Sequence, residues 1–417
     1  MNNNNSANAG ADHFGHVRML TYAMFFIFAV TTDAVGVIIP VIIEQFSLTL
    51  LQASTFHYAP MIAIAAAGIG LGFLADKLGR KIVILLGLGL FSLVCILFAV
   101  GSTFGVFLIL LICMGISVGL FKTGALALIG DISTSTNQHT KTMNFAEGFF
   151  GVGAIIGPAL VTYLLRNDVD WKYLYVIAGV VSVMTLWLAS TVKYPKKIVT
   201  ETHKVDWRSS MRLMKDGHAL FFSAGIGLYV IIECAIYVWM PTLLLGYDGP
   251  ATFLAAYALS IFFIFRAIGR FLAAWILNFI SWQVTLVLFS GTIFAFYLIS
   301  SVQGVEAAVW LLPISGLFGS VIYPTLNSKG ISGFHADQQG AAAGLILFFT
   351  AASAALGPLI MGLIGDIFGH VSYGFMFATA CTAVLFFGCV YNFIKDPTAH
   401  RLKLMDRDIA ATIPAAE

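Results

Sequence analysis

Long apolar runs, separated by short segments with charges, glycine or proline, follow one another along most of the chain. Each run has about twenty residues or more, which is the length that an α-helix needs to cross the hydrocarbon core of a bilayer. A membrane barrel would instead show short strands with alternating polar and apolar residues. The pattern therefore predicts about twelve membrane-spanning helices, at Val17–Gln45, Leu51–Ala75, Ile82–Val100, Phe104–Gly130, Thr142–Leu165, Tyr173–Val192, Ala219–Leu245, Ala251–Asn278, Trp282–Ser301, Ala307–Asn327, Gly340–Ile367 and Tyr373–Ile394.

The composition agrees with an all-α integral membrane protein. Of the 417 residues, 59% are hydrophobic and 10% are charged, and the mean hydropathy is +0.92; a soluble domain carries about 25% charged residues. The net charge of +2 gives no indication of nucleic-acid binding, because the positive residues are spread over many short loops. The five cysteines lie in apolar runs without zinc-ligand spacing, so we interpret them as small hydrophobic residues.

The longest polar interruption, Lys193–Lys215, divides the expected spans into two sets of six. It contains seven basic residues, which are Lys193, Lys196, Lys197, Lys204, Arg208, Arg212 and Lys215. We therefore expect an N-terminal tail (1–16), a six-helix bundle (17–192), a basic linker (193–215), a second six-helix bundle (216–396) and a C-terminal tail (397–417).

The Lys and Arg residues of the loops predict the orientation. Cytoplasmic loops of membrane proteins are enriched in these residues. If the N-terminus lies inside, nearly all of them fall in cytoplasmic segments, and only Arg166 and Lys172 fall outside. The prediction is a multi-pass protein of the plasma (inner) membrane with both termini in the cytoplasm.

Several unusual residues of the two halves recur about 200 positions apart. They are Asp33 and Glu233, Gly157-Pro158 and Gly357-Pro358, and, one position further, Pro40 and Pro241. A charge in the middle of an apolar span is costly and is rarely present without a function. Repeated bundles around a central site are the architecture of alternating-access transporters, and the recurrence favours that architecture here.

The segment Gly72–Lys81, between the second and third spans, reads G-F-L-A-D-K-L-G-R-K. It resembles the signature of the major facilitator superfamily, although taken alone it could be a generic basic turn. The resemblance implies two pseudo-symmetric six-helix bundles and a gating role for Gly72, Asp76, Gly79 and Arg80. Glycine lets helix ends approach closely, and Asp76 could pair with a helix end or with Arg80 to hold an outward-open state.

Three further stretches resemble the fucose–galactose–glucose:proton symporters and the related sodium-dependent glucose transporters. They are Asn144–Pro158, Tyr229–Thr242 and Ile322–Leu326. There are departures: fucose permeases have an acid in span four, where this chain has Lys122, and Glu147 stands where they have Gln. The stretch Gly153–Pro158 also resembles an element of drug:proton antiporters. The coupling chemistry of the family therefore does not transfer to this chain unchanged.

Helical periodicity places the polar residues of several spans on single faces, and polar groups avoid lipid. We expect the coupling ion to be handled by Asp33, Lys122 and Glu147. Candidate substrate-binding residues combine aromatic surfaces with hydrogen-bonding groups, as a sugar requires; they are Asn144, Glu147, Phe149, Tyr229, Glu233, Tyr237, Trp239, Arg266, Tyr323 and Asn327. Alternatives stay open: Asp33 and Lys122 could form a structural pair, Glu147 could belong to a gate, and any of the aromatic residues could serve in packing.

The resemblance implies alternating-access symport of a small polar solute, a hexose or a related sugar, with protons or sodium ions. The alternative within the superfamily is an organic-anion carrier or a drug:proton antiporter. A membrane enzyme or nutrient sensor is disfavoured, since no nucleophile constellation, metal-ligand cluster or phosphate-binding glycine loop is present in the sequence. We expect no cofactor, no metal and no nucleic-acid partner, and a monomer in the bilayer.

Overall fold

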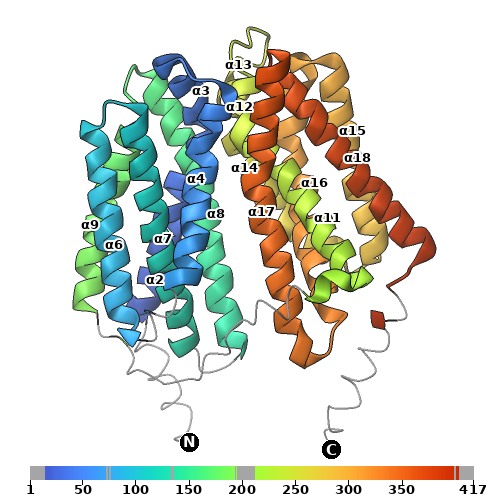
Figure 1. Cartoon of the computed structure of the whole chain (residues 1–417), viewed down its shortest axis with the longest axis horizontal. Helices are drawn as coiled ribbons and strands as arrows, with labels where there is room; N and C mark the ends of the chain where they lie inside the picture. Colours follow the sequence, from blue (N-terminus) through green and yellow to red (C-terminus); the bar gives the residue numbers. More distant parts are fainter. Residues whose placement is uncertain are drawn as a thin grey trace, which may run out of the picture. The chain divides into compact units, whose positions relative to one another are not determined.

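The computed structural model is all-helical over the residues it describes (Figure 1), which are 15–71, 74, 77–132, 136–192, 194, 212–398 and 401–402. The chain divides into two compact units, Met1–Leu48 with Gln52–Glu201 and Thr49–Leu51 with Thr202–Glu417. Ten helical segments within the described residues are long and apolar enough to cross a membrane. The helices α4 (Leu50–Leu71) and α14 (Ala258–Ile276) occupy the second and eighth expected spans.

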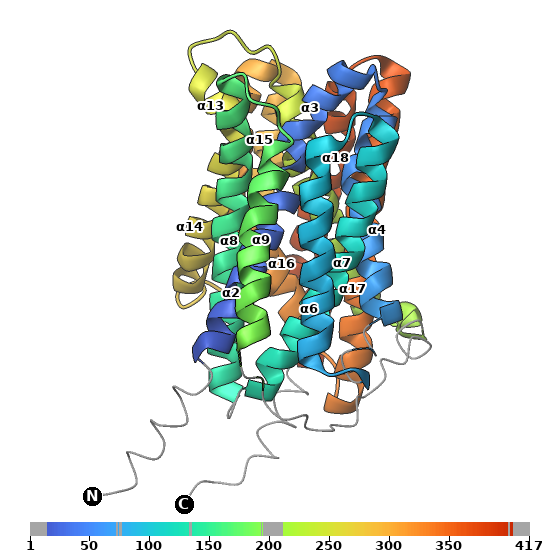
Figure 2. The same ribbon diagram turned by 90° about the vertical axis from the view of Figure 1, so that its left-hand side faces the viewer.

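The first unit contains α2 (Gly15–Thr32), α3 (Val35–Phe46), α4, α6 (Arg80–Leu97), α7 (Phe104–Ile132), α8 (Thr136–Arg166) and α9 (Tyr173–Thr191). Its helices run up and down, and α6 lies beside α9 in the turned view of Figure 2. The main contacts join α2 to α8, and α6 to both α7 and α9.

The second unit contains α11 (Gly217–Cys234), a π-helical turn (Ala235–Trp239), α12 (Met240–Leu243), α13 (Thr252–Ala256), α14, α15 (Trp282–Gln303), α16 (Val305–Ser332), α17 (Ala336–Phe368) and α18 (Ser372–Lys395). The main contacts join α14 to α16, α11 to α17, and α15 to both α16 and α18. The last three are the same pairs, in repeat order, as the main contacts of the first unit. The predicted two-bundle, pseudo-symmetric fold is therefore confirmed.

Glycine and alanine allow the bundle helices to approach closely. On α8, Gly153 and Gly157 lie against α2, where a Cβ on Gly153 would meet the Phe26 carbonyl oxygen and, at 2.9 Å, the Cβ of Ala29. On α17, Gly357 lies against Ile231 of α11, at 3.2 Å from an added Cβ. The recurring Gly-Pro elements of the sequence thus bring the fifth helix of each unit against the first.

Among the described residues, the first and seventh expected spans are interrupted, and the eighth is divided at Tyr257 into α13 and α14. The first is divided by the two-residue turn Asp33–Ala34 into α2 and α3, and the seventh contains the π-turn Ala235–Trp239, with Pro241 two residues beyond it. Proline residues also lie inside α3, α4, α8, α16 and α17. Neighbouring helices can satisfy the backbone groups that proline leaves unpaired in a membrane protein.

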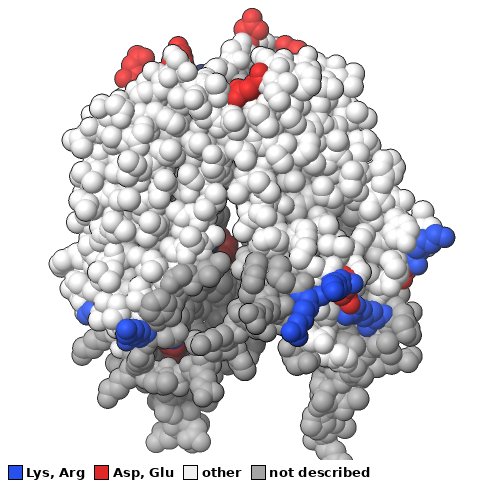
Figure 3. All heavy atoms as spheres, in the orientation of Figure 1, with Lys and Arg blue, Asp and Glu red and all other residues white. Residues whose placement is uncertain are grey.

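Charged side chains of the described residues gather at the two ends of each unit, as Figure 3 shows. In the first unit, the end at which α2 and α6 begin carries Arg80 and Lys81. In the second unit, the end at which α11 begins carries Lys215, Lys329, Lys395 and Arg401. The opposite end carries acidic residues, which include Glu44, Asp168 and Asp170 in the first unit and Asp248, Glu306 and Asp366 in the second.

Candidate substrate and coupling sites

A polar cluster lies within the second unit around Glu233, the next-to-last residue of α11. The Tyr229 hydroxyl, one helical turn earlier, donates a hydrogen bond to Glu233 Oε1 at 2.9 Å. Arg266 Nη2 of α14 forms an ion pair with the same oxygen at 2.8 Å. The Glu233 side chain is 8% exposed and that of Arg266 is 22% exposed. The cluster therefore holds a carboxylate, a guanidinium and a phenol in a largely apolar surrounding.

Glycines of α14 and α16 bring Arg266 to this position. A Cβ on Gly316 of α16 would meet the Phe262 carbonyl oxygen and, at 3.2 Å, the Arg266 backbone nitrogen. A Cβ on Gly269 of α14 would meet the Leu317 carbonyl oxygen. Because side chains are absent at both points, the two backbones lie in contact, and Arg266 can reach α11.

The expected aromatic residues of the seventh span are held by contacts within the unit. The Tyr237 hydroxyl lies 3.0 Å from Cys234 Sγ, and its ring stacks near Phe263 with centroids 6.4 Å apart. Trp239 is fully buried, and its indole N–H donates to the Pro358 carbonyl oxygen at 3.1 Å. The structure therefore places Trp239 in the packed interior of the unit, and a substrate contact for it stays a prediction.

Tyr323 and Asn327 lie on α16, both half-buried. The Tyr323 ring lies 6.4 Å from that of Tyr229, so it adjoins the Glu233 cluster. Its hydroxyl is 3.4 Å from the Thr350 hydroxyl of α17. The structure thus brings together four expected residues of α11, α14 and α16, which are Tyr229, Glu233, Arg266 and Tyr323.

In the first unit, Lys122 of α7 is surrounded by aromatic rings. Its ammonium nitrogen lies 4.9 Å from the ring centroid of Phe28, 5.8 Å from that of Phe25 and 6.0 Å from that of Phe150. Such rings attract a cation electrostatically. The carboxylates of Glu147 and Asp33 both act on this charge. The three expected coupling residues therefore lie in one unit, and their roles stay a prediction.

Asp33 lies in the turn between α2 and α3 and is half-buried. The three candidates on α8, Asn144, Glu147 and Phe149, all have exposed side chains. The Phe149 ring stacks on Tyr22 of α2, with centroids 5.3 Å apart and planes 13° from parallel. Asn144 and Glu147 lie three residues apart and so share a face of α8, whereas Phe149 lies on the side that packs against α2.

The proposed gating segment has a partner that the sequence did not indicate. Arg80 Nε, at the start of α6, forms an ion pair at 2.9 Å with Asp131 Oδ2 near the end of α7. Gly79 has φ 90°, a conformation that favours glycine. Lys81 donates to the Ser190 carbonyl oxygen at 2.8 Å. Gly72 and Asp76 lie outside the described residues.

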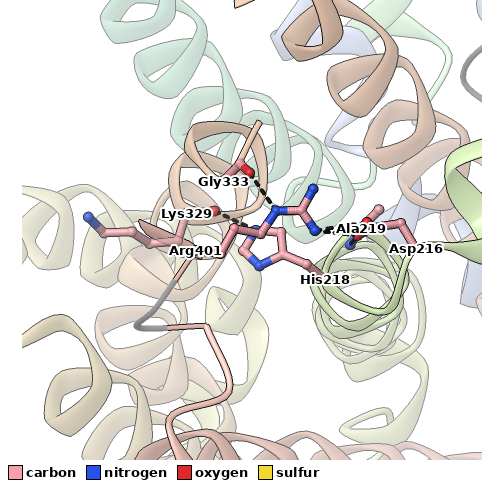
Figure 4. Close-up of polar contacts among 6 residues, drawn as sticks. All are labelled: Asp216, His218, Ala219, Lys329, Gly333 and Arg401. Carbon is pink, nitrogen blue, oxygen red and sulfur yellow. Dashed lines mark hydrogen bonds and ion pairs between the residues drawn. The ribbon is translucent and has the colours of Figure 1, made fainter. Parts of the chain in front are cut away.

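A second charged cluster, shown in Figure 4, lies at the basic end of the second unit. Arg401 Nη1 contacts Asp216 Oδ1 and Oδ2 at 2.9 and 2.8 Å, and Arg401 Nε donates to the Gly333 carbonyl oxygen at 2.6 Å. The guanidinium carbon lies 4.2 Å from the Phe334 ring centroid. Asp216 also caps α11 by accepting from the Ala219 N–H at 3.0 Å. We call these residues the Arg401 cluster.

The environment of Asp216 favours its ionised form. Its burial acts to raise the pKa of the carboxyl, but the hydrogen bonds from Ala219 and Arg401 and the charge of Arg401 outweigh this, and the pKa lies below its usual value. His218, in the next turn, lies 3.1 Å from the Lys329 carbonyl oxygen through Nε2. The sequence predicts only that Arg401 lies in a C-terminal tail, because it does not indicate the partner of a single arginine.

The described residues contain no group of three His, Cys, Asp or Glu side chains arranged to hold a metal ion. The chemistry that they offer is therefore that of ion pairs, hydrogen bonds and aromatic surfaces in interrupted spans. In a two-bundle membrane protein, interrupted helices at corresponding positions of the halves indicate a solute-binding site. The fold and these clusters define a membrane transporter.

The family is established by comparison with known proteins. Residues 21–358 match the model of the Major Facilitator Superfamily. The chain belongs to this superfamily, and it is a transporter and not an enzyme.

Curated relatives span nearly the whole chain. Quinolone resistance protein NorA of Staphylococcus aureus (strain MRSA252) is 26% identical over 411 residues, which cover 94% of this chain and 98% of that protein. Multidrug resistance protein 2 of Bacillus subtilis (strain 168) is 24% identical over 363 residues, which cover 82% and 88%.

Solved structures share the fold at lower identity. The fucose:proton symporter FucP of E. coli has a TM-score of 0.60 at 20% identity, over 91% of this chain and 99% of that chain. The nucleoside transporter NupG has a TM-score of 0.73 at 12% identity, over 92% and 99%. A D-xylose-proton symporter has a TM-score of 0.70 at 14% identity, over 91% and 97%.

Proposed function

We propose that this protein is a symporter that moves a small polar solute, a hexose or a related sugar, together with protons or sodium ions. The observation that carries the proposal is the pair of interrupted spans, each with an acid at its interruption: Asp33 between α2 and α3, and Glu233 before the π-turn. Transporters of this architecture bind solutes and coupling ions at such interruptions and alternate access by rocking their halves.

The Glu233 cluster suits a neutral solute with several hydroxyl groups. The ion pair with Arg266 leaves the cluster without net charge, yet it offers acceptor oxygens and N–H donors side by side. Tyr229 and Tyr323 add aromatic surface and hydroxyl groups. We assign this cluster to solute binding, with Asn144, Phe149 and Asn327 as further candidates. The sugar symporters among the solved structures share the fold, which is compatible with this assignment.

We assign coupling to Asp33, with Lys122 and Glu147 as the charges that influence it. A carboxylate at a helix interruption can take up a cation and release it when its surroundings change. The positive charge of Lys122 can compete with that cation for Asp33, and the negative charge of Glu147 can compete with Asp33 for Lys122. The proposal requires that Asp33 act in accumulation against a gradient and not in solute binding alone.

The test is Asp33→Asn, with Glu44→Gln as the matched control, since Glu44 is an exposed acid near the end of α3. In proteoliposomes supplied with labelled hexoses from outside, Asp33→Asn should abolish uphill accumulation of the label while counterflow exchange continues. Glu44→Gln should accumulate solute like the unaltered protein. Normal accumulation by Asp33→Asn would refute the coupling assignment.

A drug:proton antiporter or organic-anion carrier is the second candidate. The curated relatives named for quinolone and multidrug resistance favour it, and Lys122 and Arg266 could meet an anionic group. A panel of labelled hexoses, organic acids and a quinolone, assayed in the same proteoliposomes with an imposed proton or sodium gradient, separates the two. Proton-driven extrusion of the quinolone without hexose uptake would favour the second candidate.

We propose that the protein lies in the plasma (inner) membrane as a monomer, with both termini in the cytoplasm. The gathering of basic side chains at the end of each unit where α2, α6 and α11 begin supports this orientation. Arg80 and its ion pair with Asp131 would then lie at the cytoplasmic surface, where we assign the segment around Gly79 to gating.

A further inference from the structure

Tyr297 is a fully buried residue of α15, a helix that contributes no residue to the proposed solute site. Its side chain is 1% exposed. Its hydroxyl donates a hydrogen bond to the carbonyl oxygen of Ile232 at 2.7 Å. Ile232 immediately precedes Glu233 in α11. The hydrogen bond therefore holds the backbone next to the acid of the site.

The same backbone leads into the π-turn Ala235–Trp239. A π-turn is a rare irregularity of a helix and is frequent at functional sites. A carbonyl oxygen has two lone pairs, so Ile232 can accept from a side chain as well as from the helix backbone. The far end of the turn is also held, because the Trp239 indole donates to the Pro358 carbonyl oxygen of α17.

Tyr297 is in turn fixed by α18. The Thr379 hydroxyl contacts the Tyr297 carbonyl oxygen at 3.4 Å and the Ser301 hydroxyl at 2.8 Å. A chain of hydrogen bonds thus runs from α18 through α15 to the backbone of α11. It ends beside Glu233, whose carboxylate binds Arg266 and Tyr229.

We propose that Tyr297 is a positioning residue, which sets the direction of Glu233 towards Arg266 through the backbone of Ile232. This proposal rests on the function proposed for the Glu233 cluster. It does not require that Tyr297 touch the solute. Removal of the Tyr297 hydroxyl should loosen the π-turn on the Glu233 side only, while the contact of Trp239 with Pro358 persists.

The test compares Tyr297→Phe with Tyr175→Phe. Tyr175 of α9 is also a fully buried tyrosine, and its hydroxyl has no hydrogen-bond partner within the described residues. Both substitutions remove one buried hydroxyl. Tyr297→Phe should raise the KM for the transported solute about fivefold, as expected for the loss of one hydrogen bond, and should shift the pH profile of transport. Tyr175→Phe should change neither.

A second readout does not depend on transport. The infrared carboxylate band of Glu233, identified by its loss in Glu233→Gln, should move in Tyr297→Phe and stay in place in Tyr175→Phe. If the unaltered protein transports no sugar but the Glu233 band shifts in Tyr297→Phe, the proposed function fails and the positioning role stands. An unchanged band and an unchanged KM in Tyr297→Phe, or equal changes in both variants, would overturn the role.

Discussion

Glu233 and Arg266 are charges within apolar helices, where either one alone would be costly. Their 2.8 Å contact and the Tyr229 hydroxyl compensate for the lost hydration. Such pairs contribute little net stability compared with apolar residues, but breaking one by removing a single partner is strongly destabilising. The pair is therefore a sensitive point for stability and, under the proposed function, for solute binding.

We expect Arg266→Ala to lower the free energy of unfolding by about 3–5 kcal/mol, because it leaves the buried Glu233 carboxylate without its cation. Adding Glu233→Gln should restore most of this loss. The measurement is thermal unfolding of the detergent-solubilised protein. Lys215→Ala, at an exposed position just before α11, is the control and should have a small effect. A double variant less stable than Arg266→Ala would contradict the pairing.

The sequence indicated which charged residues lie within spans, but it did not indicate the ion pair of Glu233 with Arg266. Asp33, Lys122, Glu233 and Arg266 stand out because they interrupt apolar runs. The contact between Glu233 and Arg266 depends on the crossing of α14 with α16 and α11, which helical periodicity within one span does not reveal. Likewise, the sequence offered a helix end or Arg80 as partners for Asp76, which lies outside the described residues, and it did not indicate the ion pair of Arg80 with Asp131.

At the level of elements, the crossing of α14 and α16 positions Arg266. A methyl group at Gly316 would press on the Phe262 carbonyl oxygen and lie 3.2 Å from the Arg266 nitrogen. We expect Gly316→Ala to destabilise the protein by about 1–3 kcal/mol, as overpacking does, and to impair transport.

The control is Gly130→Ala on α7, where an added Cβ meets nothing within 4 Å. This substitution should be neutral or should stabilise the helix by about 0.5–1 kcal/mol, because alanine is the better helix former. Unfolding temperatures and initial transport rates, measured for both variants, test whether α14 and α16 cross tightly at Gly316. Equal behaviour of Gly316→Ala and Gly130→Ala would mean that the crossing is not tight.

The Arg401 cluster joins the start of α11, the α16–α17 loop and the segment after α18. We expect Arg401→Ala to lower the unfolding free energy by about 1.5 kcal/mol, the low end for hydrogen bonds to a charged group. Both side chains of the ion pair are 30% exposed, which weakens it. Lys395→Ala, at the exposed end of α18, is the control and should change the unfolding temperature little.

The stabilisation from Asp216 should depend on pH. Its pKa is held below the usual value of 3.8, so the carboxylate stabilises the fold above about pH 4 and loses this effect as the pH falls through its lowered pKa. The difference in unfolding temperature between the unaltered protein and Asp216→Asn should therefore be full at pH 7 and should shrink below about pH 4. A difference that grows on acidification would exclude this role for Asp216.

The spans could be predicted from apolar length alone, but their interruptions could not. The turn at Asp33–Ala34 and the π-turn Ala235–Trp239 contain residues that are compatible with a regular helix, and Pro40 and Pro241 lie beyond them. Their conformation depends on contacts from other helices, such as those of Tyr297 and Trp239. The residue pattern of one span does not indicate which residues of other helices contact it.

For the whole molecule, the internal repeat has a physical meaning in both units. Gly157 packs against Val30 of α2, and Gly357 packs against Ile231 of α11, at equivalent places about 200 residues apart. Asp33 and Glu233 then lie at interruptions of the corresponding helices. The chemistry around them differs, since Glu233 forms an ion pair with Arg266, whereas Asp33 and Glu147 both act on the charge of Lys122. This difference is the reason that the proposed function gives solute binding to Glu233 and coupling to Asp33.

The orientation of the whole chain gives the last prediction. The basic ends of the two units hold the starts of α2 and α11 and the end of α18, and positive residues favour the cytoplasmic side. A green fluorescent protein fused after Glu417 should therefore fluoresce, and alkaline phosphatase fused there should be inactive. Fusions at Asp168, in the turn between α8 and α9, should behave in the opposite way. Active phosphatase at the C-terminus would reverse the orientation and would place the ion pair of Arg80 and Asp131 on the outer surface.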